Sequence, residues 1–261
     1  MFRSLATAAS GMEAQQTKLD VTANNIANVS TNGFKKGRAE FADLMYQQVR
    51  AAGTPTGNGT MAPSATEIGL GTRLVNTSRE LSQGELHQTG NTLDVAIEGN
   101  GYIPIQLPDG SQGYTRNGAL QMSAEGKLVN SDGYEVVGGI TIPPDAQSVT
   151  IASDGTVSAT IPNQTQATEL GKIQIATFAN PAGLAGQGQN LFKETAASGT
   201  AVLSQPGEGG AGTMRQGMLE VSNVNVVEEM IDLIAGQRAY EVNSRVVKAA
   251  DEMLSDTAQL R

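Results

Sequence analysis

The sequence predicts an α+β fold in which long N- and C-terminal helices form a coiled-coil-like pair and an antiparallel β domain is inserted between them. Both ends of the chain have the apolar spacing of amphipathic helices. The middle has short β-branched runs separated by tight-turn pairs, and Gly-rich and Pro-rich segments separate the regions. We expect the first helix in 1–30, an extended linker in 31–71, the β domain in 72–215, and a return segment with the second helix in 216–261.

The amino-terminal segment has apolar or small residues at alternating intervals of three and four, which is the heptad pattern of a helix packed along another helix. These residues are Phe2, Leu5, Ala9, Met12, Leu19, Ala23 and Ile26. A run of turn formers, Asn28–Gly33, follows them and ends in a glycine that accepts positive φ. We therefore expect the chain to leave the helix axis by Gly33.

A flexible linker is predicted after this helix, because Arg50–Gly71 is rich in Gly, Pro, Ser and Thr. A second segment of similar composition, Ser198–Gly212, precedes the last helix. The architecture is therefore discontinuous, with the β domain inserted between two terminal segments that return to each other.

Short alternating or β-branched runs predict the strands of the β domain. They are Leu93–Ile97, Lys127–Val129, Ile140–Ile142, Ser148–Ile151, Thr156–Ile161 and Lys172–Phe178. Pairs such as Asp109-Gly110 and Asn117-Gly118 lie between the runs, and tight antiparallel hairpins require residues of this kind. The pattern favours an antiparallel β domain over a βαβ fold.

The last helix should begin at Asn225, a good N-cap that Glu228 completes as a capping box. Apolar residues repeat every seven positions along it: Val226, Leu233, Tyr240, Val247 and Leu254. Others broaden the stripe: Met230, Ile231, Ile234, Val242, Val246 and Met253. A helix this apolar on several sides should contact more than one neighbour. We expect both terminal helices to be loose in the monomer and to order when many copies assemble.

Composition excludes several classes of function. The 26 acidic and 17 basic residues give a net charge of −9, which argues against binding nucleic acid or an anionic membrane. No apolar run is long enough to span a membrane, and the start of the chain lacks the apolar core of a cleavable signal peptide. Cysteine is absent, so neither disulfides nor thiolate metal sites are available.

Candidate chemical sites are weak, and we expect no enzymatic activity, cofactor or metal. Gly207–Gly212 matches a dinucleotide-binding spacing but lacks the required strand and helix around it. His87 is the only histidine and has no evident partner set. The carboxylates that a glycosidase would need coincide with turn positions. The basic cluster Lys35, Lys36 and Arg38 is interpreted as a solvated or inter-subunit face.

The two ends of the chain carry a family resemblance. Residues Ala23–Lys35 resemble the amino-terminal signature of the bacterial flagellar rod and hook family. Residues 224–230 and 237–244 are similar to its carboxy-terminal signature, and residues 93–101, 108–110 and 114–118 look like its β domain. Chain length and the segment Tyr46–Gly71 are most similar to distal rod subunits of that family, with a proximal rod or hook subunit as the alternative.

The resemblance implies a structural subunit that is exported unfolded through the flagellar type III apparatus without signal cleavage. It implies a homo-oligomer that polymerises helically into a drive shaft across the periplasm. Its neighbours would be proximal rod and hook subunits and the surrounding P and L ring proteins. A soluble β-domain enzyme or a glycan-binding module is the contrasting hypothesis, and it would stay monomeric.

Site residues also follow from the resemblance. The self-assembly residues would be Leu5, Met12, Leu19, Asn24, Asn25, Ile26, Val226, Met230, Leu233, Tyr240, Val247 and Leu254. The rod would owe its stiffness to a segment that includes Tyr46, Arg50, Pro55, Pro63 and Gly71.

Three local questions stay open from the sequence. The glycines inside the helices, Gly11 and Gly236, mark either a close helix approach or tolerated flexibility. Asn24 and Asn25 would hydrogen-bond either near the helix end or across subunits. Pro104 predicts an edge strand or a bulge, since proline cannot donate a ladder hydrogen bond.

Overall fold

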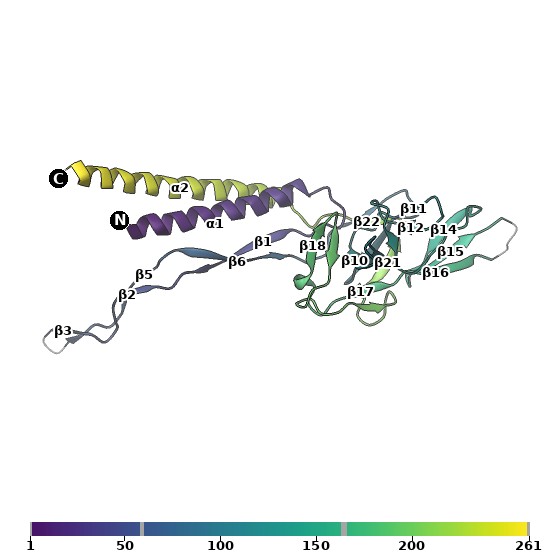
Figure 1. Cartoon of the computed structure of the whole chain (residues 1–261), viewed down its shortest axis with the longest axis horizontal. Coiled ribbons are helices and arrows are strands. Elements are labelled where there is room, and N and C mark those ends of the chain that lie inside the picture. The colour runs from purple at the N-terminus through teal and green to yellow at the C-terminus, as the bar shows by residue number, and fades with distance from the viewer. Residues whose placement is uncertain (1, 58–59, 163–165, 260–261) are drawn as a thin grey trace. The chain divides into compact units, whose positions relative to one another are not determined.

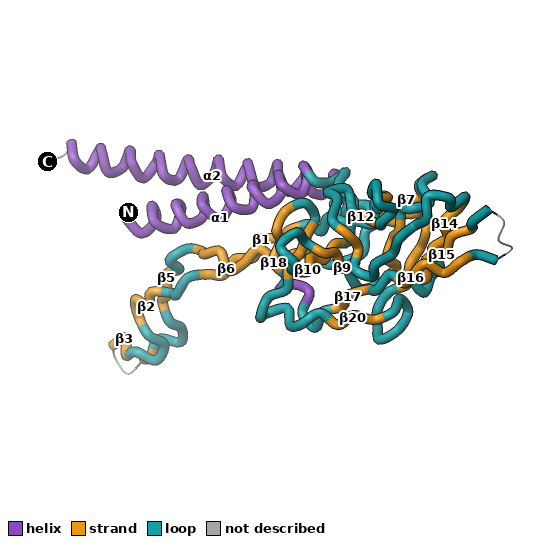
Figure 2. Tube along the Cα trace, turned by 45° about the vertical axis from the view of Figure 1, so that its right-hand side comes forward, coloured by secondary structure: helices purple, strands orange, loops and turns teal. Residues whose placement is uncertain are grey.

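The computed structural model describes residues 2–57, 60–162 and 166–259. It divides the chain into two units whose elements are shown in Figures 1 and 2.

The helical unit consists of residues 1–27, 37–78 and 225–261, and the β unit consists of residues 28–36 and 79–224. The chain passes from one unit to the other at each of the four boundaries between these ranges.

The helical unit contains α1 (Phe2–Ala27) and α2 (Val226–Gln259). Neighbouring residues follow opposite orders along the two helices: Asn25 with Glu229, Leu19 with Gly236, and Gly11 with Asn243. The helices are therefore antiparallel neighbours, as Figure 1 shows.

Local sequence signals lie at the end of α1 and at the start of α2. α1 ends at Ala27, and Gly33 in the turn that follows has a φ of +71°. Before α2, the Asn225 Oδ1 atom accepts a hydrogen bond from the Val227 N–H group at 3.1 Å, which is the N-cap interaction. The predicted N-cap at Asn225 is confirmed.

The helical unit also contains a long excursion of paired strands. β1 (Gly37–Asp43) pairs with β6 (Thr72–Arg79), β2 (Gln47–Arg50) with β5 (Thr66–Ile68), and β3 (Pro55–Gly57) with β4 (Thr60–Met61). We call residues 44–71 the arm; Figures 1 and 2 show it leaving the helix pair. Composition predicts a flexible linker for Arg50–Gly71, whereas the structure has paired strands there. Glycine allows the backbone to turn in this segment, since Gly53 has a φ of +80°.

The β unit is built from short strands and one 3₁₀ turn. They are β7 (Leu86–Gln88), β8 (Val95–Glu98), β9 (Ile103–Gln106), β10 (Gln112–Thr115), β11 (Gln121–Met122), β12 (Leu128–Val129), β13 (Glu135–Val136), β14 (Ser148–Ile151), β15 (Thr156–Thr160), β16 (Thr168–Lys172), β17 (Ile175–Thr177), η1 (Pro181–Gly183), β18 (Ala185–Gly188), β19 (Leu191–Lys193), β20 (Val202–Ser204), β21 (Thr213–Gln216) and β22 (Met218–Glu220).

The largest sheet has seven strands in the order β11-β12-β13-β9-β10-β19-β18. A three-stranded sheet, β14-β15-β16, and the pairs β17–β20, β8–β21 and β7–β22 complete the unit. The paired strands described within this unit are antiparallel, so the predicted antiparallel β region is confirmed. The main core is aliphatic and includes Val95, Ile97, Ile103, Ile105, Leu120, Leu128, Val157, Ile173 and Ile175. A smaller cluster gathers Tyr102, Tyr114, Ala176, Leu184 and Phe192.

Pro104 lies in an interior strand, so the expectation of an edge strand or a bulge is wrong. β9 lies between β13 and β10, and Pro104 is in register with Tyr114. The Pro104 carbonyl accepts a hydrogen bond from the Val137 N–H group at 2.9 Å, just beyond the end of β13. In an antiparallel ladder the N–H and C=O groups of one residue face the same neighbouring strand. The N–H group that Pro104 lacks would therefore face Val137, which lies beyond the end of β13.

Candidate functional site

The predicted apolar stripe of α2 divides into a side that contacts α1 and a side that does not. Val226, Leu233, Val247 and Leu254 are partly buried. Between these positions, at intervals of three and four, lie Glu229, Gly236, Asn243 and Ala250. The α1-facing seam therefore alternates larger apolar residues with small or polar ones.

The seam of α1 differs in part from the predicted one. Leu5, Met12, Leu19 and Ile26 are partly buried. Ala9 and Ala23 are exposed, and the buried residues are Ala8 and Thr22, one position earlier. The prediction for the two alanines is wrong because alanine lies on both sides of this seam and contributes little burial energy to set the helix face.

Both helix-interior glycines mark a close approach of the two helices. A Cβ atom on Gly11 would lie 2.9 Å from Nδ2 of Asn243, and one on Gly236 would lie 3.0 Å from Cδ2 of Leu19. Real Cβ atoms rarely come so near to another atom. Of the two readings of these glycines, the structure supports close approach.

Asn25 joins three segments of the helical unit. Its side chain is buried, with 2% of the residue exposed. Its Oδ1 atom accepts from the Gly37 N–H group at 2.8 Å, and its Nδ2 donates to the Gly37 carbonyl at 2.9 Å and to Glu229 Oε2 at 3.1 Å. Asn25 therefore fixes α1 to β1 and to α2 within one chain, while the neighbouring Asn24 is exposed.

We expect Asn25→Ala to lower the free energy of unfolding of the helical unit by about 2–3 kcal/mol, because three hydrogen bonds of this buried side chain are lost at about 1 kcal/mol each. Urea unfolding followed by circular dichroism at the helix band would measure this change. Gln16→Ala, at an exposed position of the same helix, is the matched control, with an expected change below about 0.5 kcal/mol. Equal effects of the two substitutions would contradict the assignment.

The outer side of α2 carries a broad apolar surface that is exposed in the described chain. Its exposed side chains are Val227, Met230, Ile231, Ile234, Val242, Val246 and Met253. Tyr240, which the sequence places in the seam register, is also exposed. Among the described residues of both helices, the fully buried apolar ones are all alanines: Ala8, Ala14 and Ala250. We call these seven exposed side chains of the outer side the α2 apolar face. An exposed surface of this kind indicates a protein-interaction site.

The predicted stiffness residues lie on the arm, where Tyr46, Arg50, Pro55 and Pro63 are exposed. At its base, Gly71 packs on α1: a Cβ there would lie 2.2 Å from Ser10 Oγ, and its φ is +115°. Apolar side chains are exposed along the arm: Met45, Tyr46, Val49, Met61, Ile68 and Leu70. Among the arm residues whose side chains are described, Ala62 alone is buried.

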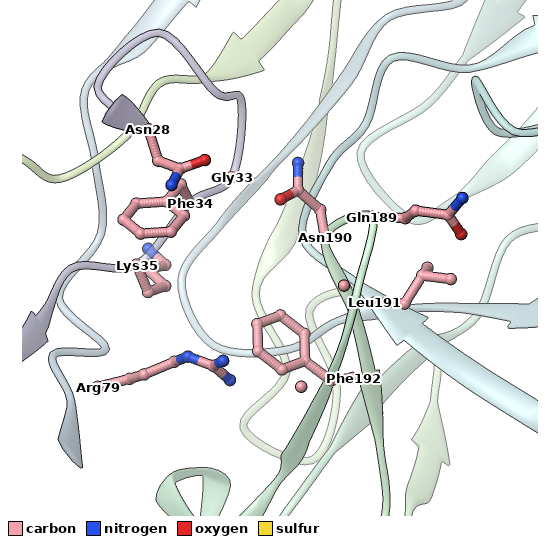
Figure 3. A pocket seen from close by; sticks show the side chains of 11 residues that line it. Asn28, Gly33, Phe34, Lys35, Arg79, Gln189, Asn190, Leu191 and Phe192 are labelled. Carbon is pink, nitrogen blue, oxygen red and sulfur yellow. The ribbon is translucent and has the colours of Figure 1, made fainter. Parts of the chain in front are cut away.

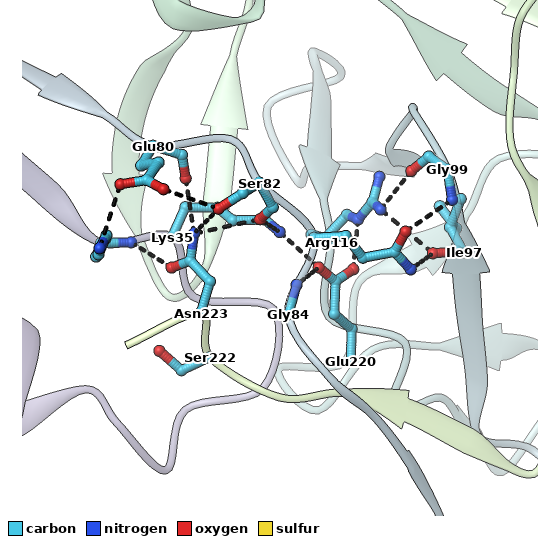
Figure 4. A network of polar contacts seen from close by, with 12 residues as sticks. Lys35, Glu80, Ser82, Gly84, Ile97, Gly99, Arg116, Glu220, Ser222 and Asn223 are labelled. Atoms are coloured by element: carbon cyan, nitrogen blue, oxygen red, sulfur yellow. Dashed lines mark hydrogen bonds and ion pairs between the residues drawn. The ribbon is translucent and has the colours of Figure 1, made fainter. Parts of the chain in front are cut away.

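A buried ionic cluster in the β unit was missed by the sequence analysis. Lys35 donates to Glu220 Oε1, and the Arg116 Nε atom donates to Glu220 Oε2 at 2.6 Å. The three side chains are 3%, 1% and 6% exposed for Lys35, Glu220 and Arg116. The interpretation of Lys35 as part of a solvated or inter-subunit face is therefore wrong. Figure 4 shows the cluster.

The surrounding charges decide the ionisation of the cluster. Burial alone would raise the pKa of Glu220, but Arg116 and Lys35 outweigh it, so this pKa lies below its ordinary value. Burial lowers the pKa of Lys35, and the hydrogen bond to Glu220 opposes that shift. Glu220 is therefore ionised at neutral pH.

The Asn223 side chain links its own segment to two other segments of the chain close to this cluster (Figure 4). Its Oδ1 atom accepts from the Lys36 N–H group at 2.8 Å, and its Nδ2 donates to the carbonyls of Glu80 at 2.9 Å and Ser82 at 3.2 Å. Lys36 and Glu80 also form an ion pair at 3.3 Å. These bonds anchor residues 28–36 in the β unit.

A small pocket of about 210 Å³ borders the same segment (Figure 3). Arg79 lies over the Phe192 ring, with its guanidinium carbon 5.0 Å from the ring centroid. Gln189 and Asn190 form a turn with φ values of 53° and 59°, which only a minority of residues other than glycine adopt. Asn190 Nδ2 donates to the Asn32 carbonyl at 3.2 Å, so the turn also holds residues 28–36.

No helix among the described residues is long and apolar enough to cross a membrane. Gly207–Gly212 forms turns, as expected for a loop without the dinucleotide-binding context.

Three family models match the chain. "Flagella basal body rod protein" matches residues 5–35, "Flagellar hook protein FlgE/F/G D1 domain" matches residues 96–159, and "Flagellar basal body rod FlgEFG protein C-terminal" matches residues 215–260.

Curated relatives match over nearly their whole length. The flagellar basal-body rod protein FlgG of Borreliella burgdorferi is 47% identical over 100% of this chain and 99% of its own. FlgG of Agrobacterium fabrum is 50% identical over 97% of both chains, and FlgG of Bacillus subtilis is 42% identical over 100% of both. The crystal structure of Helicobacter pylori flagellar hook protein FlgE2 covers 71% of this chain and 43% of its own at 16% identity, with a TM-score of 0.26.

Proposed function

This chain belongs to the family of flagellar basal-body rod proteins, and we propose that it self-assembles helically into the distal rod, the rigid shaft that transmits torque from motor to hook across the periplasm. The observation that carries the proposal is the α2 apolar face. Burying it against other copies would supply the stabilisation that the pair of helices lacks when isolated. In a helical assembly, every subunit has further copies of the same chain as its neighbours.

In this proposal the helix pairs of many copies form the inner tube by coiled-coil-like packing. The seam residues Leu5, Met12, Leu19, Ile26, Val226, Leu233, Val247 and Leu254 hold each pair together. Met230 and Tyr240, both exposed, contact neighbouring copies. In sequence, the β domain is inserted between the two segments that form this tube.

The same proposal extends to export and partners. The subunit leaves the cytoplasm through the flagellar type III apparatus without signal cleavage, and its terminal helices order fully on assembly. Its neighbours are proximal rod and hook subunits inside the P and L rings. An enzymatic role has no support in the family, whose members carry rod and hook names.

Isolated basal bodies test the distal assignment against the alternative of a proximal rod or hook subunit. Cells lacking the chain should yield basal bodies with a short rod that ends before its distal part. Rods that are absent altogether would favour a proximal subunit, and complete rods without hooks would favour a hook subunit. Re-expression of the chain should restore full-length rods.

The arm is our candidate for rod stiffness, because its exposed apolar side chains can pack between neighbours. Residues 51–65 are replaced by Asn-Gly, a two-residue turn that preserves the β2–β5 pairing in which Arg50 lies opposite Thr66. We expect tubes that still form but bend more, measured as a shorter persistence length in electron micrographs. A variant with residues 51–65 in shuffled order keeps the length of the arm and changes its sequence, so it separates the effect of arm sequence from the effect of arm length. Tubes as straight as those of the parent would contradict the role of the arm.

A further inference from the structure

A pocket of about 640 Å³ opens on the β unit beside the buried ionic cluster. Its lining includes Lys35, Tyr102, Arg116, Phe178 and Val202, and we call it the Tyr102 pocket. The volume lies within the range of ligand-binding sites. No family match or relative assigns it a role.

The pocket borders a buried excess of positive charge. Lys35 and Arg116 contribute two positive charges, and Glu220, their shared partner, contributes one negative charge, which leaves a net charge of +1. None of the residues that line the pocket is acidic. A buried charge without a counter-charge is unfavourable, so this wall of the pocket attracts an anion.

Both cations keep an unused hydrogen-bond donor. An ammonium group has three N–H donors, and Lys35 uses two of them, to the Ser82 carbonyl and to Glu220. A guanidinium group has five, and Arg116 uses four, to Glu220 and to the carbonyls of Ile97, Gly99 and Gly101. Each side chain therefore has one N–H group without a partner among the described residues.

Tyr102 adds a third donor. The residue is 6% exposed, and its ring packs edge-to-face on Phe178 and Phe192 with centroid distances of 5.8 and 5.6 Å. Its hydroxyl has no hydrogen-bond partner in the described part of the chain. Burial raises the pKa of Tyr102, with Arg116 and Arg79 opposing the shift, so the hydroxyl keeps its proton at neutral pH.

We propose that the Tyr102 pocket binds a carboxylate, and that its occupant is an aspartate or glutamate side chain of a second copy of this chain. Three unused donors and a net positive charge suit a carboxylate, an acceptor group that takes hydrogen bonds at both oxygens. Each copy has 26 acidic against 17 basic residues and so carries surplus carboxylates. The choice of a second copy as occupant rests on the proposed assembly into a rod. Exposed Leu81 and Val202 in the lining give the stem of the side chain an apolar contact.

The first test uses the unassembled chain and sodium acetate as the probe. We expect acetate to shift the backbone amide signal of Gly101 saturably in nuclear magnetic resonance spectra, while sodium chloride at equal ionic strength does not. Tyr102→Phe removes one hydrogen bond to a charged group and should weaken acetate binding at least about tenfold. Tyr134→Phe, which removes a hydroxyl outside the pocket, should leave it unchanged. Equal responses to acetate and chloride would overturn carboxylate binding.

The second test concerns the occupant. A photo-crosslinking residue in place of Val202, at the exposed rim, should link to an acidic segment of another copy in assembled tubes. Tyr102→Phe should raise the concentration needed for tube formation about tenfold, and Tyr134→Phe should change it less than about twofold. Tubes without such crosslinks, together with assembly of Tyr102→Phe at the concentration of the parent, would overturn the second copy as occupant. If no variant or parent forms tubes, the proposed function fails, and the acetate titration still decides the chemistry of the pocket.

Discussion

Leu233→Asp is expected to abolish tube formation while the β unit stays folded. Leu233 lies in the α2 seam between Glu229 and Gly236, on the side that contacts α1. The substitution loses about 1.5–3 kcal/mol of apolar burial and places an ionised carboxylate against apolar neighbours. Because every copy in a helical assembly carries the same defect, the concentration needed for assembly should rise far beyond tenfold. Leu19→Asp, on the facing helix, should behave in the same way.

Sedimentation and electron microscopy would measure tube formation by these variants, and tyrosine circular dichroism would report the fold of the β unit. Leu233→Met is the matched control, since a swap that conserves volume costs less than about 1.5 kcal/mol. Normal tubes from Leu233→Asp would show that the helix pair is not the assembly element. Loss of the tyrosine signal would instead show that the β unit depends on the helices.

Glu220→Gln should destabilise the β unit by about 3–5 kcal/mol, the usual penalty for removing one partner of a buried ionic cluster. Lys35 and Arg116 would then be buried without a counter-charge. Urea unfolding followed by the tyrosine signal would measure the change. Glu135→Gln is the control, because it breaks the exposed pair with Lys127, which contributes less than about 1 kcal/mol. Similar effects of the two variants would contradict the structural role of Glu220.

The same cluster predicts a pH dependence. The pKa of Glu220 is lowered in the folded chain from an ordinary 4.5, so in the interval between the two values the unfolded chain binds more protons. The stabilisation is therefore fully present above about pH 4.5 and is lost as the pH falls through the folded pKa. Urea unfolding between pH 3 and 6 should show this loss in the parent and its absence in Glu220→Gln. Parallel profiles for the two proteins would contradict it.

The features that sequence predicted are those that depend on near neighbours in the chain. The N-cap at Asn225 and the turn that ends at Gly33 depend on the hydrogen bonding and conformation of the local backbone, and the structure confirms both. The antiparallel β region follows from turn pairs, which fix hairpins locally. The seven-residue repeat of α2 placed Val226, Leu233, Val247 and Leu254 correctly on a partly buried side, because a helical period is a local property.

Features that depend on distant residues were missed or misassigned. Lys35 looked like a solvated charge because its partner, Glu220, lies 185 residues away. The apolar neighbours Leu219 and Val221 give no signal for this burial, because successive side chains of a strand point to opposite faces. Ala9 and Ala23 were placed in the α1 seam because alanines flank the true positions. Pro104 was assigned to an edge because strand order is set by the whole sheet.

The measurement that tests self-assembly most directly is electron microscopy of the purified chain over a range of concentrations, with circular dichroism of the same samples. We expect straight tubes above a threshold concentration and a gain in helical signal as they form, because the α2 apolar face becomes buried between copies. A chain that stays monomeric at every concentration, with its helical signal constant, would contradict the proposal that the helix pair is completed by other copies.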